Sequence, residues 1–299
     1  MKKQRLFAVL LAGLLFLPDG LAQESSALPF VAIDRNPATA AMGGAQAVSG
    51  LYNPSAVPFT GSDIVFSFQR WAPGFFKTNN LNLLGAFKVG DRLGIKLEGA
   101  YQMGSEYAQV SEGGIPGNKT IRPQDLLAGV GVGYAFTGNM SAGVSARFAS
   151  SSFGSGTSYS AIGADAFFLY HNGGLSATVG IASIGTAVKS GSNTYPLPTS
   201  VKVGGGYDVA FEESAFKLAA DFDYFLSGGI GAAIGGEYGF KDMLFFRAGA
   251  HIGSGNAPLP TFVTLGAGAK FSGFHVDLCW MTANEILGNT LTFGLGYRF

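Results

Sequence analysis

The last nine residues of the chain, 291–299, alternate strictly between two kinds of side chain. Every second position is apolar or aromatic, namely Leu291, Phe293, Leu295, Tyr297 and Phe299. Thr, Gly or Arg stands at each position between them. A period of two predicts a β-strand with one apolar face and one face that is not apolar. An aromatic residue at the end of such a strand is typical of bacterial outer-membrane β-barrels, so this segment predicts a membrane barrel.

The start of the chain predicts a secretory signal peptide over residues 1–22. Lys2, Lys3 and Arg5 precede an apolar run over residues 6–17, and small residues follow up to Ala22. A charged segment, a short apolar segment and small residues at a cleavage site are the three parts of a signal peptide. The alternative is a membrane anchor, but the apolar run is shorter than the ~20 residues that a spanning helix needs.

The composition argues against several classes of protein. Without residues 1–22 the chain holds 16 basic and 18 acidic residues (19 − 3 and 19 − 1), so it lacks the basic field of a nucleic-acid binder. Cys279 is alone and cannot form an intramolecular disulfide. No later apolar run is long enough for a transmembrane helix, and only helices and closed barrels satisfy the backbone in lipid. An exported apolar chain of this kind therefore favours a barrel.

The sequence predicts an antiparallel barrel of about fourteen strands over residues 62–299. Their ranges are 62–70, 80–89, 92–103, 124–136, 139–150, 158–170, 174–182, 199–209, 214–225, 229–240, 243–252, 259–270, 273–281 and 290–299. Every second connection is a tight turn rich in Gly, Asn and Asp, which hairpins require. The other connections are mostly longer, although Ser227-Gly228 is short. Short periplasmic turns and long extracellular loops are typical of outer-membrane barrels, so both termini are expected in the periplasm.

Charged residues within the strands fall on the face opposite the apolar set. A charge turned towards lipid at the membrane midplane would cost about 2–4 kcal/mol, so the polar face is the expected lumen. There the sequence predicts a network of charges that pair across neighbouring strands. Its members are Lys96, Glu98, Lys202, Asp221, Asp223, Arg247, Asp277 and Arg298.

Glycine is frequent on the same inner face, where it leaves space for another backbone to approach. The candidate for that space is the segment over residues 23–61, which we expect to form an amino-terminal hatch that plugs the barrel. It contains two Asn-Pro steps, which favour turns. The residues expected to shape or gate the hatch are Asn36, Pro37, Met42, Gly43, Gly44, Asn53 and Pro54.

The hatch segment resembles the start of the PorV/PorQ group of outer-membrane proteins, which are relatives of the FadL long-chain fatty-acid transporters. The resemblance rests on the stretches 34–45 and 51–56, with their Met-Gly-Gly-Ala and Asn-Pro-Ser-Ala motifs. It continues in the Leu-Pro-Thr-Ser-Val-Lys-Val-Gly of 197–204, the Phe-Arg-Ala-Gly of 246–249, the stretch 271–277 and the Leu-Gly-Asn-Thr of 287–290. The resemblance implies a barrel with an amino-terminal hatch.

Catalytic and cofactor interpretations are weaker, and we expect neither enzyme activity nor a cofactor. His251 and His275 stand two strands apart with Asp277 near the second, a spacing that fits no metal signature. A lipase within the barrel would need Ser and His on the lipid face, whereas both histidines point inward. Gly129-Val-Gly-Val-Gly133 is not followed by the helix that a dinucleotide fingerprint needs.

Two functions from different classes stay open. By resemblance, a PorV/PorQ-type barrel would bind partner or cargo proteins at the outer membrane, as in type IX secretion. The alternative is a FadL-like channel for small hydrophobic molecules, opened when the hatch shifts. The aromatic loop that contains Trp71, Phe75 and Phe76 could capture a hydrophobic ligand or a protein, although an interfacial anchor is the favoured interpretation. Membrane lipid is the other expected partner, and nucleic acid is not expected.

Overall fold

The barrel is built from fourteen strands, as the computed structural model shows for residues 26–73, 77–110, 116–154, 156–282 and 288–299. The predicted signal peptide, Phe75 and Phe76 lie outside these described residues. The barrel strands are β1 (Asp63–Trp71), β2 (Thr78–Val89), β3 (Leu93–Met103), β6 (Gln124–Ala135), β7 (Met140–Ser152), β8 (Ser158–Asn172), β9 (Leu175–Gly185), β12 (Ser200–Ala210), β13 (Ser214–Phe225), β14 (Ile230–Phe240), β15 (Leu244–Ser254), β16 (Phe262–Phe271), β17 (Phe274–Thr282) and β18 (Asn289–Arg298).

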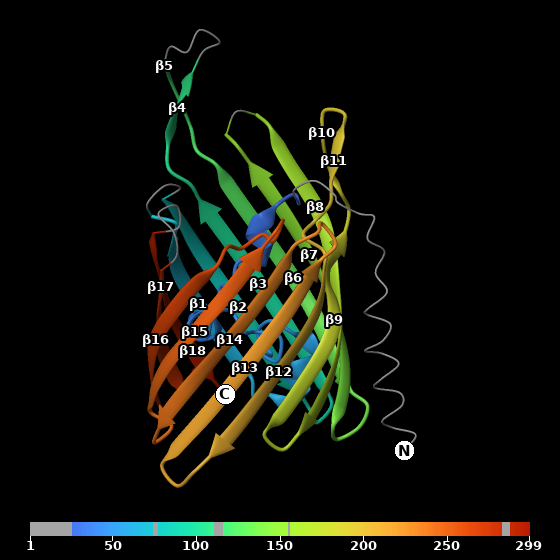
Figure 1. Cartoon of the computed structure of the whole chain (residues 1–299), viewed down its shortest axis with the longest axis vertical. Coiled ribbons are helices and arrows are strands. Elements are labelled where there is room, and N and C mark those ends of the chain that lie inside the picture. The colour runs from blue at the N-terminus through green and yellow to red at the C-terminus, as the bar shows by residue number, and fades with distance from the viewer. Residues whose placement is uncertain (1–25, 74–76, 111–115, 155, 283–287) are drawn as a thin grey trace.

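Each barrel strand pairs antiparallel with its neighbours, and β1 closes the ring against β18 (Figure 1). The predicted antiparallel barrel of fourteen strands is therefore confirmed. No helix among the described residues is long and apolar enough to cross a membrane. The tight turns gather at one end of the barrel, where the chain also ends, and the long loops gather at the other (Figure 1). We refer to these as the tight-turn end and the long-loop end.

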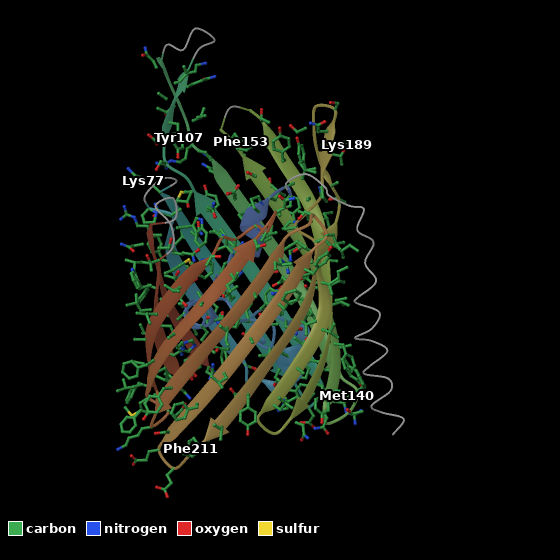
Figure 2. All side chains as sticks on the ribbon, in the orientation of Figure 1. Lys77, Tyr107, Met140, Phe153, Lys189 and Phe211 are labelled. Atoms are coloured by element: carbon green, nitrogen blue, oxygen red, sulfur yellow. The ribbon has the colours of Figure 1, made fainter. Side chains whose placement is uncertain are left out.

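The long loops contain two small sheets that the sequence did not predict. β4 (Tyr107–Val110) pairs with β5 (Pro116–Ile121), and β10 (Val188–Ser190) pairs with β11 (Asn193–Tyr195). Both hairpins project beyond the barrel at the long-loop end (Figure 1). Tyr107 and Lys189 mark them in Figure 2, whereas Met140 and Phe211 lie at the tight-turn end. Val188 of β10 is buried, but most of the other described side chains of these short strands are exposed, so the two-residue pattern of the barrel strands is absent from them.

Most predicted strand boundaries agree with the structure within two residues, and two differ by three residues, each for a local reason. β16 begins at Phe262 rather than at residue 259, because Pro260 has no N–H to donate to the ladder. β9 continues to Gly185 rather than ending at residue 182. Its register against β8 shifts beside Ser183, whose φ of 57° marks a β-bulge. The bulge absorbs one extra residue, so the strand continues beyond the point where its alternation is interrupted.

The two faces of the wall differ as predicted. Leu97, Val130 and Ile162 point outward and are 46, 50 and 60% exposed, whereas Lys96, between outward-facing neighbours, is 1% exposed. An exposed apolar surface on every side suits lipid rather than water. The inner face carries the charged and small residues and surrounds the amino-terminal segment of the chain.

The carboxy-terminal strand pairs with the strand that follows the hatch. Asp63 stands opposite Arg298, and Phe66 opposite Leu295. Beyond the ladder, the Phe299 N–H donates to the Ser62 carbonyl at 3.0 Å, and the Phe299 ring lies 5.0 Å from that of Tyr297. The last residue is thus part of the closure between the first and last strands.

Deleting Phe299 should reduce the amount of folded barrel in the membrane several-fold, because it removes the hydrogen bond to Ser62 and the aromatic end of the seam. Heat-dependent mobility of the protein in membrane fractions measures the folded amount. Phe299→Tyr, which keeps the backbone bond and the ring, is the matched control. Equal amounts of folded barrel in the deletion variant and the wild type would contradict this role.

Candidate functional site

Residues 26–61 form the hatch, which lies inside the barrel and contains three short helical turns. They are η1 (Pro29–Ala32), α2 (Pro37–Ala40) and η2 (Pro54–Phe59). Asn36 begins α2, where its side chain accepts a hydrogen bond from the Ala38 N–H at 3.3 Å. Asn53 begins η2 in the same way, accepting from the Ser55 N–H at 2.9 Å. Each Asn-Pro step thus combines a capping side chain with a proline that fits the first helical position.

Glycines of the inner wall make room for the hatch. A Cβ at Gly133 would lie 1.9 Å from the Pro54 carbonyl oxygen, and one at Gly249 would lie 2.2 Å from the Gly43 nitrogen. A Cβ at Gly235 would lie 2.3 Å from the Met42 oxygen. Gly43 and Gly44 themselves have φ values of 74 and 82°, which other residues rarely adopt. The hatch backbone therefore touches the wall backbone directly, with no space for a side chain between them.

Side chains of the wall hold the hatch at several points around the ring. The carboxylate Oδ2 of Asp221 accepts from the Gln46 and Ala47 N–H groups, both at 2.8 Å. Three strands away around the wall, on β16, Thr264 Oγ1 accepts from the Gly43 N–H at 3.0 Å and donates to the Ala41 carbonyl at 2.9 Å. These contacts satisfy hatch backbone groups that the short turns leave without partners.

Other strands add single hydrogen bonds to the hatch. Ser141 Oγ donates to the Ser55 carbonyl at 2.6 Å, and Ser67 Oγ donates to the Arg35 carbonyl at 2.6 Å. The Asn53 amide donates to Thr178 Oγ1 at 3.1 Å. Sequence reasoning missed these hydroxyl groups. The signal that could have found them is their position on the inward face of otherwise apolar strands.

Two groups of buried charges surround the middle of the hatch. Lys96 lies 3.0 Å from Glu98, and Arg147 bridges Glu98 to Asp165. Across the lumen, Lys202 lies 2.6 Å from Asp223 and 3.8 Å from Asp221. The Tyr52 ring of the hatch lies between the two groups, 5.8 Å from the Lys96 ammonium and 5.4 Å from that of Lys202. Arg147 and Asp165 are members of this network that the sequence did not single out.

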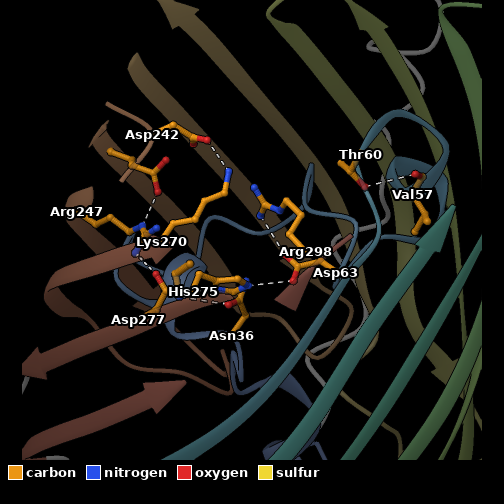
Figure 3. A network of polar contacts seen from close by, with 12 residues as sticks. Asn36, Val57, Thr60, Asp63, Asp242, Arg247, Lys270, His275, Asp277 and Arg298 are labelled. Atoms are coloured by element: carbon orange, nitrogen blue, oxygen red, sulfur yellow. Dashed lines mark hydrogen bonds and ion pairs between the residues drawn. The ribbon is translucent and has the colours of Figure 1, made fainter. Parts of the chain in front are cut away.

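A second chain of charges runs along the tight-turn end and crosses the seam of the barrel (Figure 3). Arg247 contacts Glu237 on one side and Asp277 at 2.5 Å on the other. His275 then lies 2.7 Å from Asp277 and 3.0 Å from Asp63, and Arg298 lies 3.0 Å from the same Asp63. Asp221 and Asp223 do not belong to this chain of charges, because both pair with Lys202, which the sequence predicts in the same lumen network.

The two histidines of the wall do not meet. His251 Nδ1 lies 2.9 Å from the Pro260 carbonyl, while His275 belongs to the chain of charges at the seam. Within the described part of the chain, no group of three or more His, Cys, Asp or Glu side chains has the geometry to hold a metal ion. The geometry therefore points to packing and hydrogen bonding for both residues.

Above the hatch, at the long-loop end, lies a chamber of about 1120 Å³. Leu28, Phe30 and Ile33 of the hatch form its floor, and Trp71 and Leu259 belong to its wall. Trp71 is the last residue of β1, faces inward and is 9% exposed. The favoured interpretation of Trp71 as an interfacial anchor was therefore wrong, because β1 extends one residue further than predicted and its alternation turns the ring into the lumen.

Two smaller cavities lie next to the hatch. One of about 90 Å³ borders the central charges, and one of about 340 Å³ opens beside the chain of charges at the tight-turn end. The hatch residues Asn36, Thr39, Ser49 and Leu51 line both. These four residues of the hatch therefore lie between the two cavities.

No family model matches the sequence. No curated protein matches it either. Solved structures do match. CymD, a monoaromatic hydrocarbon channel, has a TM-score of 0.59 at 14% identity, over 88% of this chain and 97% of that one. The toluene transporter TbuX of Ralstonia pickettii has a TM-score of 0.57 at 13% identity, over 88% and 97%. A FadL homologue of Pseudomonas aeruginosa has a TM-score of 0.51 at 11% identity, over 89% and 98%.

The chain has the fold of these channels. The similarity covers 88–89% of this chain, and at 11–14% identity it shows a shared fold. Whether the chain is a channel or a partner-binding component of the PorV/PorQ type stays a prediction.

Proposed function

We propose that this chain is an outer-membrane channel for small hydrophobic molecules, in which the hatch is the plug. The observation that carries the proposal is the chamber above the hatch, which is lined mostly by apolar side chains and bordered by the long loops. Large, mostly apolar cavities with a few polar groups are typical ligand sites. The proposal assigns no catalytic step to the chain.

The proposed route runs from the long-loop end into the chamber and then along the hatch. Short turns face the periplasm in outer-membrane barrels, so we place the tight-turn end and the carboxy-terminus there. The hatch is held mainly by single hydrogen bonds and by contacts with glycine. Such contacts can exchange with water more readily than a large packed core, which suits a plug that must shift. Asn36 and Asn53, at the starts of α2 and η2, are the positions about which we expect it to move.

Replacing Trp71 with Ala should lower uptake of an aromatic hydrocarbon about tenfold at low concentration, because an aromatic contact contributes ~0.5–1.5 kcal/mol beyond the area it buries. Accumulation of radiolabelled toluene by cells that carry the wild type, the variant or no copy of the gene measures this effect. Phe68→Ala is the matched control, since Phe68 lies on the same strand but faces lipid and is 40% exposed.

Equal toluene uptake with and without the gene would contradict the proposed function. A loss of uptake in Phe68→Ala as large as that in Trp71→Ala would show that strand stability, and not the chamber, determines the rate. Heat-dependent mobility of each variant in membrane fractions verifies that the same amount of barrel is folded.

A further inference from the structure

The chamber has a polar side that a channel for hydrocarbons alone does not require. Four inward-facing residues stand in one row across neighbouring strands, because Gln102 is opposite Asp125, Asp125 is opposite Ser151, and Ser151 is opposite Tyr159. All four line the chamber. At the end of the row the Tyr159 hydroxyl lies 3.0 Å from Ser190 Oγ. The row thus places hydrogen-bonding groups at one height on one side of the cavity.

Asp125 is the charged member of this row. Of the described residues that line the chamber, it alone carries a charge. No Lys, Arg or His nitrogen of the described chain lies within 4.0 Å of its carboxylate, whereas the lumen carboxylates lower in the barrel have such partners. A carboxylate offers acceptors only, so the row presents a hydrogen-bond acceptor to whatever fills the chamber.

The row continues beyond the chamber in buried amides. Gln102 is opposite Asn80, and Asn80 is opposite Gln69. The Asn80 amide donates to Gln69 Oε1 at 2.9 Å, but Asn80 Oδ1 has no hydrogen-bond partner among the described residues. Buried acceptors are normally paired, so Asn80 lacks a donor. Asp125 has a hydrogen bond with its neighbour Ser151, and its two carboxylate oxygens have further acceptor positions for a ligand.

A cation in the hatch offsets the charge of Asp125. The Arg35 guanidinium donates to the Ile33 and Phe30 carbonyls at 3.0 and 2.6 Å, and its charge favours the ionised form of Asp125, although Glu98 is its stronger electrostatic partner. The two charges sum to zero near the floor of the chamber. A neutral ligand therefore suits the site better than an ion, whose transfer into a mostly apolar cavity is costly.

We propose that the chamber selects hydrophobic molecules that carry one neutral hydroxyl group, with the hydroxyl donating to Asp125 and the apolar body lying against Trp71, Phe30 and Leu259. This inference rests on the proposed function and specifies its substrate class. The hydroxyl proton stays on the ligand, so no bond is made or broken. Asp125 is thus a specificity-determining residue, while the aromatic and aliphatic side chains supply most of the contact area.

Equilibrium binding to the purified full-length protein in detergent tests the proposal with four ligands of one ring size: toluene, 4-methylphenol, benzylamine and benzoate. The wild type should bind 4-methylphenol about tenfold more tightly than toluene, after correction for partition into detergent, since a hydrogen bond to a charged group has about that effect. Asp125→Leu should remove this preference and leave toluene binding unchanged. Asp125→Asn, which keeps an acceptor, should retain most of it.

Each result separates this inference from the proposed function. Toluene and 4-methylphenol bound equally by the wild type, or a preference that survives in Asp125→Leu, would overturn the inference and leave the channel in place. Tightest binding of benzylamine or benzoate would overturn it in favour of a charged ligand. If none of the four ligands binds, both the substrate class and the proposed channel fail. Asp208→Leu, at the far end of the barrel, controls for a general effect of removing a carboxylate.

Discussion

Replacing Gly133 with Leu should displace the hatch and leave the barrel open. A Cβ at this position would lie 1.9 Å from the Pro54 carbonyl oxygen and 2.7 Å from its carbon, and both are backbone atoms that no change of rotamer can move. The barrel wall is a continuous ladder here, with Gly133 opposite Gly94 and Gly143, so the hatch must give way. We expect the conductance of single proteins in planar lipid bilayers to rise at least about tenfold, because a lumen of fourteen strands is wide enough for a passage once its plug moves.

The matched control is Gly99→Leu on the adjacent strand β3. An added Cβ there meets nothing within 4 Å, so the same substitution leaves the hatch in place. Conductance of Gly99→Leu should equal that of the wild type. If the Gly133→Leu protein shows folded mobility on gels but no rise in conductance, the contact between the hatch at Pro54 and the wall at Gly133 does not hold the plug in place.

Replacing Lys202 with Met should destabilise the folded protein by about 3–5 kcal/mol, the usual cost of leaving buried charges without their partner. Lys202 lies between Asp223 and Asp221, and all three side chains are largely or wholly buried. Removing the ammonium leaves two neighbouring carboxylates in the lumen with no cation within 4.0 Å among the described residues. Unfolding in urea, followed by tryptophan fluorescence in lipid vesicles, measures the loss.

The double variant Lys202→Met with Asp223→Asn should recover much of that stability. Asp221 keeps the Gln46 and Ala47 N–H groups, so a single carboxylate in this place is still solvated by the hatch. A double variant less stable than Lys202→Met alone would show that the aspartates do not repel one another. The difference in stability between the double variant and Lys202→Met alone measures how strongly Asp223 affects the protein once Lys202 is absent.

The barrel could be predicted from local patterns because the alternation of apolar and polar residues is visible within each strand by itself. Phe66 and Phe68 face lipid while Ser67 and Gln69 face the lumen, and this alternation is visible in nine consecutive residues. Tight turns then fix which strands are neighbours. The pairing of β1 with β18 needs only the knowledge that the ring closes.

The candidate site was predicted less completely, because its contacts join residues far apart in sequence. The Asn-Pro steps indicated where the hatch turns, but nothing local connects Thr264 with Gly43 or Asp221 with Gln46. Trp71 shows how a difference of one residue in strand length changes an interpretation. The predicted strand ended at Arg70 and placed Trp71 in a loop, whereas β1 includes Trp71 and turns it into the lumen. Asp125 was missed because Gln102 and Ser151 are far from it in sequence. They can be seen to lie beside it only when the register of the strands is known.

The distribution of hatch contacts has a consequence for assembly. η2 packs against β2, β3, β6, β7 and β8, all from the first half of the barrel, whereas α2 packs against β16, β17 and β18 at its end. Neither half of the wall alone offers the hatch all of its partners. We therefore expect the hatch to reach its full set of contacts only when both halves of the wall are in place, so that its docking depends on the assembly of the whole ring.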